Sequence, residues 1–112
     1  MLCILRSTSF LIIAVLLGAC STVQVGQDFD IHTLEMKIKR GATTQNQVRT
    51  WLGAPTSEGI SVDTGGNSYD EWAYYFASGK LPSMSNAKVK ILQIKFDKQG
   101  VVRGYNWSIS NP

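Results

Sequence analysis

The sequence has little of what catalytic and metal sites are built from. It holds two cysteines and one histidine among 112 residues. Cys3 and Cys20 both fall within the first 20 residues, so the rest of the chain offers no thiol beside His32, as thiol catalysis and most zinc sites require. Asp70 and Glu71 are adjacent, so on a strand they point to opposite faces and cannot share a proton. We therefore expect no enzymatic activity, no metal site and no cofactor.

The chain also lacks a long apolar run and a block of like charge. Its longest uncharged apolar run, Phe10 to Leu17, is about half the roughly 20 residues that a membrane-spanning helix needs. Lysine and arginine total 11 against 8 acidic residues, and they are spread along the chain. A nucleic-acid-binding protein would carry a clustered basic face. We therefore expect no nucleic-acid partner.

The first twenty residues have the organisation of a bacterial export signal. Arg6 precedes the apolar run, and small residues follow it. The tetrapeptide Leu17-Gly18-Ala19-Cys20 matches the lipobox of bacterial lipoproteins, in which the cysteine sulfur accepts a diacylglycerol. We expect residues 1–19 to be a signal peptide and Cys20 to be lipid-modified. The alternative is an ordinary secreted protein cut nearby, which would leave Cys20 as an unpaired thiol.

The expected lipid defines where the domain works. Loss of Cys3 with the signal leaves no second cysteine for a disulfide, and several acyl chains hold a protein to a membrane essentially permanently. Residue 21 is serine and not aspartate, which by the sorting rule of Gram-negative lipoproteins indicates the outer membrane. We expect a lipid-anchored domain that faces the periplasm, joined to Cys20 by a flexible tether over residues 20–29.

Residues 30–112 are enough for one compact domain, and their first part predicts two short helices. Asp30 is a suitable N-cap, and Gly41 is expected to end the first helix. Thr44 and the residue three positions later have the spacing of a capping box for a second helix, which Gly53 ends. The apolar positions repeat at helical spacing: Ile31, Leu34 and Ile38, then Val48, Trp51 and Leu52.

After Pro55 the apolar period changes to two, which predicts strands. Trp72, Tyr74 and Phe76 alternate in one segment, residues 89–96 form the clearest strand, and residues 101–109 return after a tight turn with Val101, Tyr105 and Trp107 on one face. Residues 60–62 are a possible extra strand, and residues 79–87 are expected to form a loop. The prediction is an α+β fold of order ααβββ, with both helices on one face of a three-stranded antiparallel meander.

These residues resemble the SmpA/OmlA (BamE-like) family of outer-membrane lipoproteins over about residues 30 to 108. The pattern reads Ile38-x-x-Gly41-x-Thr43-Thr44-x-x-x-Val48-x-x-x-Leu52-Gly53-x-Pro55, then Trp72-x-Tyr74, then Phe96-Asp97-x-x-Gly100-Val101-Val102. The resemblance implies the ααβββ fold and an accessory or scaffold role in assembling β-barrel proteins into the outer membrane. It further implies BamD or BamA as partners, together with anionic phospholipid.

Two other functions stay open at this stage. The family also contains lipoproteins outside the barrel-assembly complex, including envelope-stress proteins. Units of this fold also occur, doubled, in β-lactamase inhibitors, so a protein-binding or inhibitory periplasmic lipoprotein is an alternative, although fold alone does not give function.

For the docking surface, the sequence suggests two groups of residues. Ile38, Lys39 and Arg40 end the first predicted helix, and cations near a bilayer attract anionic headgroups. Tyr75 and Tyr105 are expected on the exposed side of the sheet, where aromatic side chains anchor protein interfaces. The plainer alternatives are that Lys39 and Arg40 only complement the helix dipole and that the tyrosines form a second small cluster.

Overall fold

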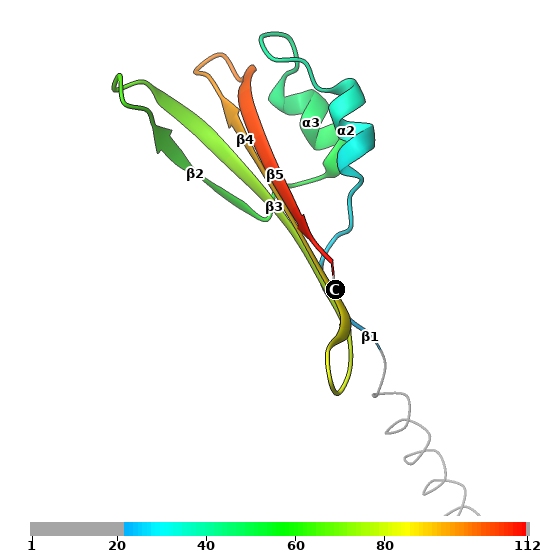
Figure 1. Cartoon of the computed structure of the whole chain (residues 1–112). Coiled ribbons are helices and arrows are strands. Elements are labelled where there is room, and N and C mark those ends of the chain that lie inside the picture. The colour runs from blue at the N-terminus through cyan, green and yellow to red at the C-terminus, as the bar shows by residue number, and fades with distance from the viewer. Residues whose placement is uncertain (1–21, 112) are drawn as a thin grey trace, which may run out of the picture.

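The computed structural model describes residues 22–111 and shows an α+β fold, as predicted (Figure 1). The expected signal peptide, Cys3 and Cys20 lie outside the described residues. Within residues 22–111 no helix is both long enough and apolar enough to cross a membrane. The elements in chain order are β1 Thr22–Gly26, α2 Ile31–Lys37, α3 Gln45–Leu52, β2 Ser57–Val62, β3 Ser68–Lys80, β4 Ser85–Phe96 and β5 Val102–Ser110.

The sheet is antiparallel and has five strands. Its order is β1-β3-β4-β5, and β2 also pairs with β3. The predicted meander is β3, β4 and β5, in which Trp72 lies opposite Ile94 and Leu92 lies opposite Trp107. The possible extra strand at residues 60–62 is confirmed as part of β2, which pairs with β3 across a turn closed by Asp63 and Asn67. The predicted loop at residues 79–87 is shorter than expected, because β3 runs to Lys80 and β4 starts at Ser85.

Strand β1 lies where the sequence predicted a flexible tether, and for residues 22–26 that prediction is wrong. Val23 pairs with Gly79, and Gly26 pairs with Phe76. Because β2 covers only the first half of β3, the second half has a free edge that the alternating Thr-Val-Gln-Val segment can pair with. Gly26 adopts a φ of 75°, and a Cβ there would stand 2.2 Å from the Tyr75 carbonyl oxygen, so the close approach requires glycine.

Both helices have the caps that the sequence predicts. The Asp30 carboxylate accepts from the amides of His32 and Thr33, and Thr44 and Gln47 form a reciprocal capping box. The first helix ends at Lys37, earlier than expected, because Ile38 turns to extended backbone and buries its side chain.

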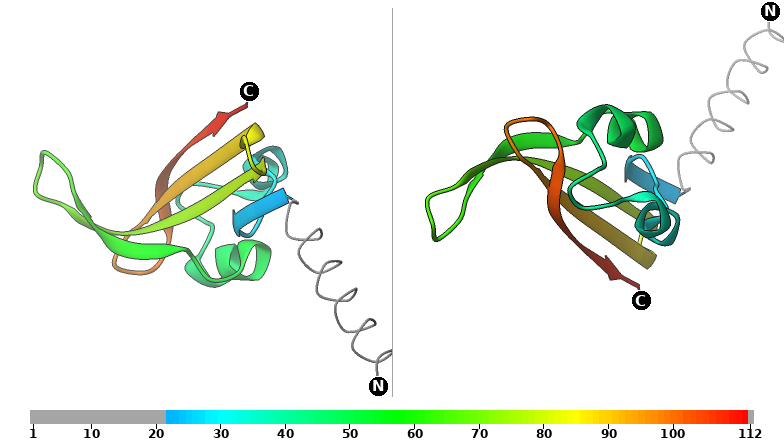
Figure 2. Two further views of the ribbon diagram at one scale, coloured as in Figure 1. Left: turned by 90° about the horizontal axis from the view of Figure 1, so that it is seen from below. Right: turned by 90° about the horizontal axis from the view of Figure 1, so that it is seen from above.

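The core lies between the two helices and one face of the sheet (Figures 1 and 2). The Trp72 ring packs on the Phe96 ring with centroids 4.7 Å apart. The Tyr74 hydroxyl donates to the Gly53 carbonyl oxygen over 2.9 Å, and burial raises the pKa of this phenol to about 12. Full burial of one valine, leucine or isoleucine side chain of this core contributes about 1.5–3 kcal/mol to the free energy of unfolding. The buried cluster comprises Ile31, Leu34, Ile38, Val48, Trp72, Tyr74, Leu92, Ile94, Phe96 and Val102.

Candidate docking surface

The turn between the helices holds two of the predicted site residues at the surface and buries the third. Ile38 is only 6% exposed and belongs to the core, whereas Lys39 and Arg40 are exposed. The Thr43 hydroxyl accepts from the Lys39 amide over 2.8 Å, and the Gly41 amide donates to the Val102 carbonyl oxygen over 2.8 Å. The turn is therefore fixed to the start of β5 and presents two cations on a rigid support.

Tyr75 and Tyr105 lie on opposite faces of the sheet, so the expectation that they share one exposed side is wrong. Tyr105 lies opposite Ile94 and packs against the core on the helix face. Tyr75 lies opposite Ile91, between the positions that face the helices, and is 39% exposed.

An irregularity in β5 accounts for the difference. Phe96 pairs with Val102 but Lys95 pairs with Gly104, so Arg103 is an extra residue on this strand. The extra residue shifts the alternation by one position. Val102, and not Val101 as predicted, therefore shares a face with Tyr105 and Trp107.

A shallow hollow between α2 and β5 does bring Arg40 and Tyr105 together. Glu35 and Trp107 line it as well, and the Trp107 indole N–H donates to Glu35 over 2.6 Å. His32 meets the Trp107 ring edge to face, with centroids 6.3 Å apart. Trp107 remains 38% exposed. The hollow thus combines an aromatic anchor with charges of both signs, which suits a protein partner.

A second hollow lies between the two helices, and no sequence pattern predicted it. It is bordered by Asp28, Asp30 and Lys37, with Trp51 on the other side. The Lys37 ammonium stands 5.7 Å from the centroid of the Trp51 ring, a cation–π contact. These residues come from three segments, and only the pairing of helices brings them together.

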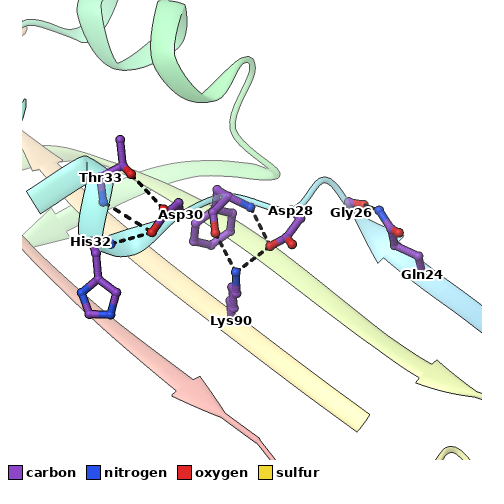
Figure 3. Close-up of polar contacts among 8 residues, drawn as sticks. Gln24, Gly26, Asp28, Asp30, His32, Thr33 and Lys90 are labelled. Carbon is purple, nitrogen blue, oxygen red and sulfur yellow. Dashed lines mark hydrogen bonds and ion pairs between the residues drawn. The ribbon is translucent and has the colours of Figure 1, made fainter. Parts of the chain in front are cut away.

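The segment between β1 and α2 is held down by Lys90 (Figure 3). The Lys90 ammonium donates to the Asp28 carboxylate over 2.7 Å and to the Phe29 carbonyl oxygen over 2.8 Å. This bond holds the pKa of Asp28 below its ordinary value. Asp30 also has a lowered pKa, because its carboxylate accepts from the Thr33 hydroxyl. This cluster positions the chain and leaves no free base.

The two ends of the sheet are far apart. Thr22 pairs with Lys80, whereas Val102 pairs with Phe96, which pairs with Asp70. The ten steps of β3 from residue 70 to residue 80 span about 33 Å at 3.3 Å per residue. The turn with Lys39 and Arg40 therefore lies at the end of the molecule away from the first residue of β1 (Figure 1).

In chemical terms the surface offers binding groups. No group of three potential metal-ligating side chains occurs among residues 22–111. His32, the one histidine, is exposed and contacts an indole ring. Arg40, Tyr105 and Trp107 can hold an acidic or apolar partner surface, and they are fixed by the turn, by the sheet and by Glu35.

Comparison with known proteins agrees with this description. Residues 33–106 match the model of the outer membrane protein assembly factor BamE domain, and the match runs from α2 to most of β5. No individual curated protein matches the chain. The matched region contains most of α2, all of α3 and β2 to β4, and β5 up to residue 106, which confirms the family resemblance seen in the sequence. The chain therefore belongs to the BamE family of outer membrane protein assembly factors, which are not enzymes.

Proposed function

We propose that this protein is a lipid-anchored accessory subunit that supports the assembly of β-barrel proteins into the outer membrane by docking to other components of the assembly machinery. The observation that carries the proposal is the BamE-domain match over residues 33–106. The protein would act as a scaffold that holds a partner in position, with BamD or BamA as the partner and anionic phospholipid as the surrounding surface.

The anchor in this proposal is Cys20, acylated after removal of residues 1–19. The pattern Leu17-Gly18-Ala19-Cys20 supports it. Acyl chains would supply nearly all the membrane affinity. A Cys20→Ala variant should therefore appear in the soluble fraction or remain uncleaved. A processed Cys20→Ala protein that still sediments with outer membranes would contradict the anchor.

The docking surface in this proposal is the hollow between α2 and β5. Arg40, Tyr105 and Trp107 are its binding groups, because aromatic and arginine side chains are enriched where interfaces are strongest. Tyr75 is a second candidate on the face without helices. We do not assign anionic phospholipid to Lys39 and Arg40, because their turn lies at the end of the sheet away from the start of β1. We assign them to an acidic protein surface.

Co-purification from detergent-solubilised membranes tests the proposal. The tagged full-length protein should capture BamD or BamA, and Trp107→Ala should reduce that capture several-fold. Tyr75→Ala, at the alternative site on the opposite face, should leave capture unchanged. If Tyr75→Ala alone reduces capture, the docking surface is on the other face.

The same experiment distinguishes the alternatives. Capture of a soluble periplasmic enzyme would indicate an inhibitory module and contradict the assembly role. Capture of neither, together with normal outer-membrane permeability in a deletion strain, would also contradict it and would favour an envelope-stress lipoprotein without a tight partner.

A further inference from the structure

The β3–β4 hairpin ends beside the first residue of β1. Thr22 pairs with Lys80, and the tip of the hairpin, residues 81–84, follows directly (Figure 1). Cys20 is two residues before Thr22, and two residues of extended chain reach about 7 Å. If Cys20 carries the anchor, as the proposed function holds, the tip must lie close to the membrane surface. A tether of ten free residues would have imposed no such position.

The tip exposes apolar side chains. Leu81 is 40% exposed and Met84 is 45% exposed. The Met84 side chain lies over Gly79, where an added Cβ would stand 2.6 Å from the Met84 methyl carbon. On the helix-free face next to the tip, Val25 and Val89 flank Ala77 in one row across three strands, and both valines are exposed. Adjacent apolar side chains at one end of a small domain are typical of an interaction site.

Lysines are the charged side chains next to the tip, and the Asp28 carboxylate in this half of the molecule is paired with Lys90. Lys80 and Lys88 lie at the base of the tip, where Lys80 pairs with Ser85 and Lys88 with Ser78. Residues 72–96 contain four lysines and no aspartate or glutamate, and residues 22–27 contain no charge. An apolar tip framed by lysines is complementary to a bilayer interface with anionic headgroups.

We propose that the tip of the β3–β4 hairpin, Leu81 to Met84, enters the headgroup region of the leaflet that holds the Cys20 anchor. Lys80 and Lys88 then lie among anionic headgroups. The sheet then extends away from the membrane, and the hollow of Arg40, Tyr105 and Trp107 between α2 and β5 faces the periplasm. The partner of this end of the molecule is lipid, and the partner of the other end is protein.

The test uses single-cysteine labelling of the full, processed lipoprotein. Acylation blocks Cys20, so Met84→Cys carries the only reactive thiol and can be labelled with a polarity-sensitive fluorophore. Val62→Cys, at the end of β2 away from the tip, is the matched control, because Val62 is also exposed. Leu81→Cys serves as a second tip position if the first variant misfolds. Each protein is placed in vesicles of phosphatidylethanolamine with phosphatidylglycerol that contain a headgroup-level nitroxide lipid.

The tip probes should shift to shorter emission wavelength and be quenched several-fold more than the Val62 probe. Lys80→Gln with Lys88→Gln should reduce the quenching in these vesicles and should have no effect in vesicles of phosphatidylcholine alone. Vesicle-bound protein whose tip probes are quenched no more than the Val62 probe would overturn the inference while leaving the anchor intact. Protein that does not float with vesicles at all would overturn the anchor as well. Shielding seen only in native membranes would assign the tip to a protein and also overturn the inference.

Discussion

Lys90 and Asp28 form an ion pair of 2.7 Å that joins residues 62 positions apart in the sequence. Lys90 is only 8% exposed, and its ammonium also donates to the Phe29 carbonyl oxygen and stands 5.8 Å from the Phe76 ring centroid. One buried lysine on β4 thus fixes the chain between β1 and α2.

Loss of that lysine should loosen the first part of the domain. A hydrogen bond from a charged group is worth about 1.5–3 kcal/mol, so Lys90→Met should lower the free energy of unfolding by an amount in that range. It should also speed amide hydrogen exchange in β1. Lys98→Met, at an exposed turn, is the control and should change neither. Unchanged exchange in residues 22–26 of Lys90→Met would show that strand pairing alone holds β1.

Truncation of Trp72 should strongly destabilise the domain. It is 6% exposed and packs on Phe96, with the Arg49 guanidinium 4.9 Å from its ring centroid. Trp72→Ala should cost about 3–5 kcal/mol, which is much of the stability of a small domain. Ile60→Ala, an apolar truncation at an exposed position of β2, should cost little. Thermal melts of both variants measure the difference in stability, and equal midpoints would contradict the assignment of Trp72 to the core.

Reversal of charge at the turn between the helices should affect the protein partner and not the membrane. Lys39→Glu with Arg40→Glu removes two exposed attractions, each worth up to about 1 kcal/mol, and replaces them with repulsion of an acidic partner, so partner affinity should fall by about thirtyfold or more. The loss should shrink at high salt. Lys80→Glu with Lys88→Glu makes the same charge change at the other end and should instead weaken the lipid contact of the tip. Binding isotherms that respond equally to both pairs would refute the separation of roles.

Stability should fall on acidification. The backbone amide of Val101 and the Arg103 guanidinium donate to Asp97 and lower its pKa, and Lys90 does so for Asp28. The unfolded chain then binds more protons than the folded one near pH 4, so these carboxylates stabilise the fold above the ordinary value of 3.8 and less as the pH falls through their folded values. Chemical unfolding at several pH values should show this slope, and Asp97→Asn should flatten it. A slope that Asp97→Asn leaves unaltered would place the linkage elsewhere.

The parts of the fold that local rules determine could be predicted from the sequence. Thr44 with Gln47 forms the capping box, and Trp72 with Tyr74 lies on the helix face, because caps and alternation depend on residues a few positions apart. Membership of the BamE family was also predicted, since glycines and aromatic residues occur at the family's spacing.

Other features depend on distant pairing. Strand β1 forms because the second half of β3 leaves its edge free, and the residues that pair there are 50 to 58 positions apart in the sequence. The extra residue Arg103 reverses the expected face of Tyr105, and an alternation rule has no means to detect it. For the site, Arg40 was correctly predicted to be exposed, while Ile38 is buried by the early end of α2. Glu35 and Trp107 are hydrogen-bonded to each other, but they are 72 positions apart and only the tertiary fold brings them together.

The pairing of β3 on both sides has one more consequence. At 13 residues it is the longest strand of the sheet, and its outer edge is shared between the five residues of β1 and the six of β2. Long free edges recruit other strands, and short interrupted ones do so poorly. In the proposed role, beside β-barrel chains that are not yet inserted, a long free edge would pair with those chains. By dividing the outer edge of β3 between two short strands, this protein leaves no long edge on that side of the sheet.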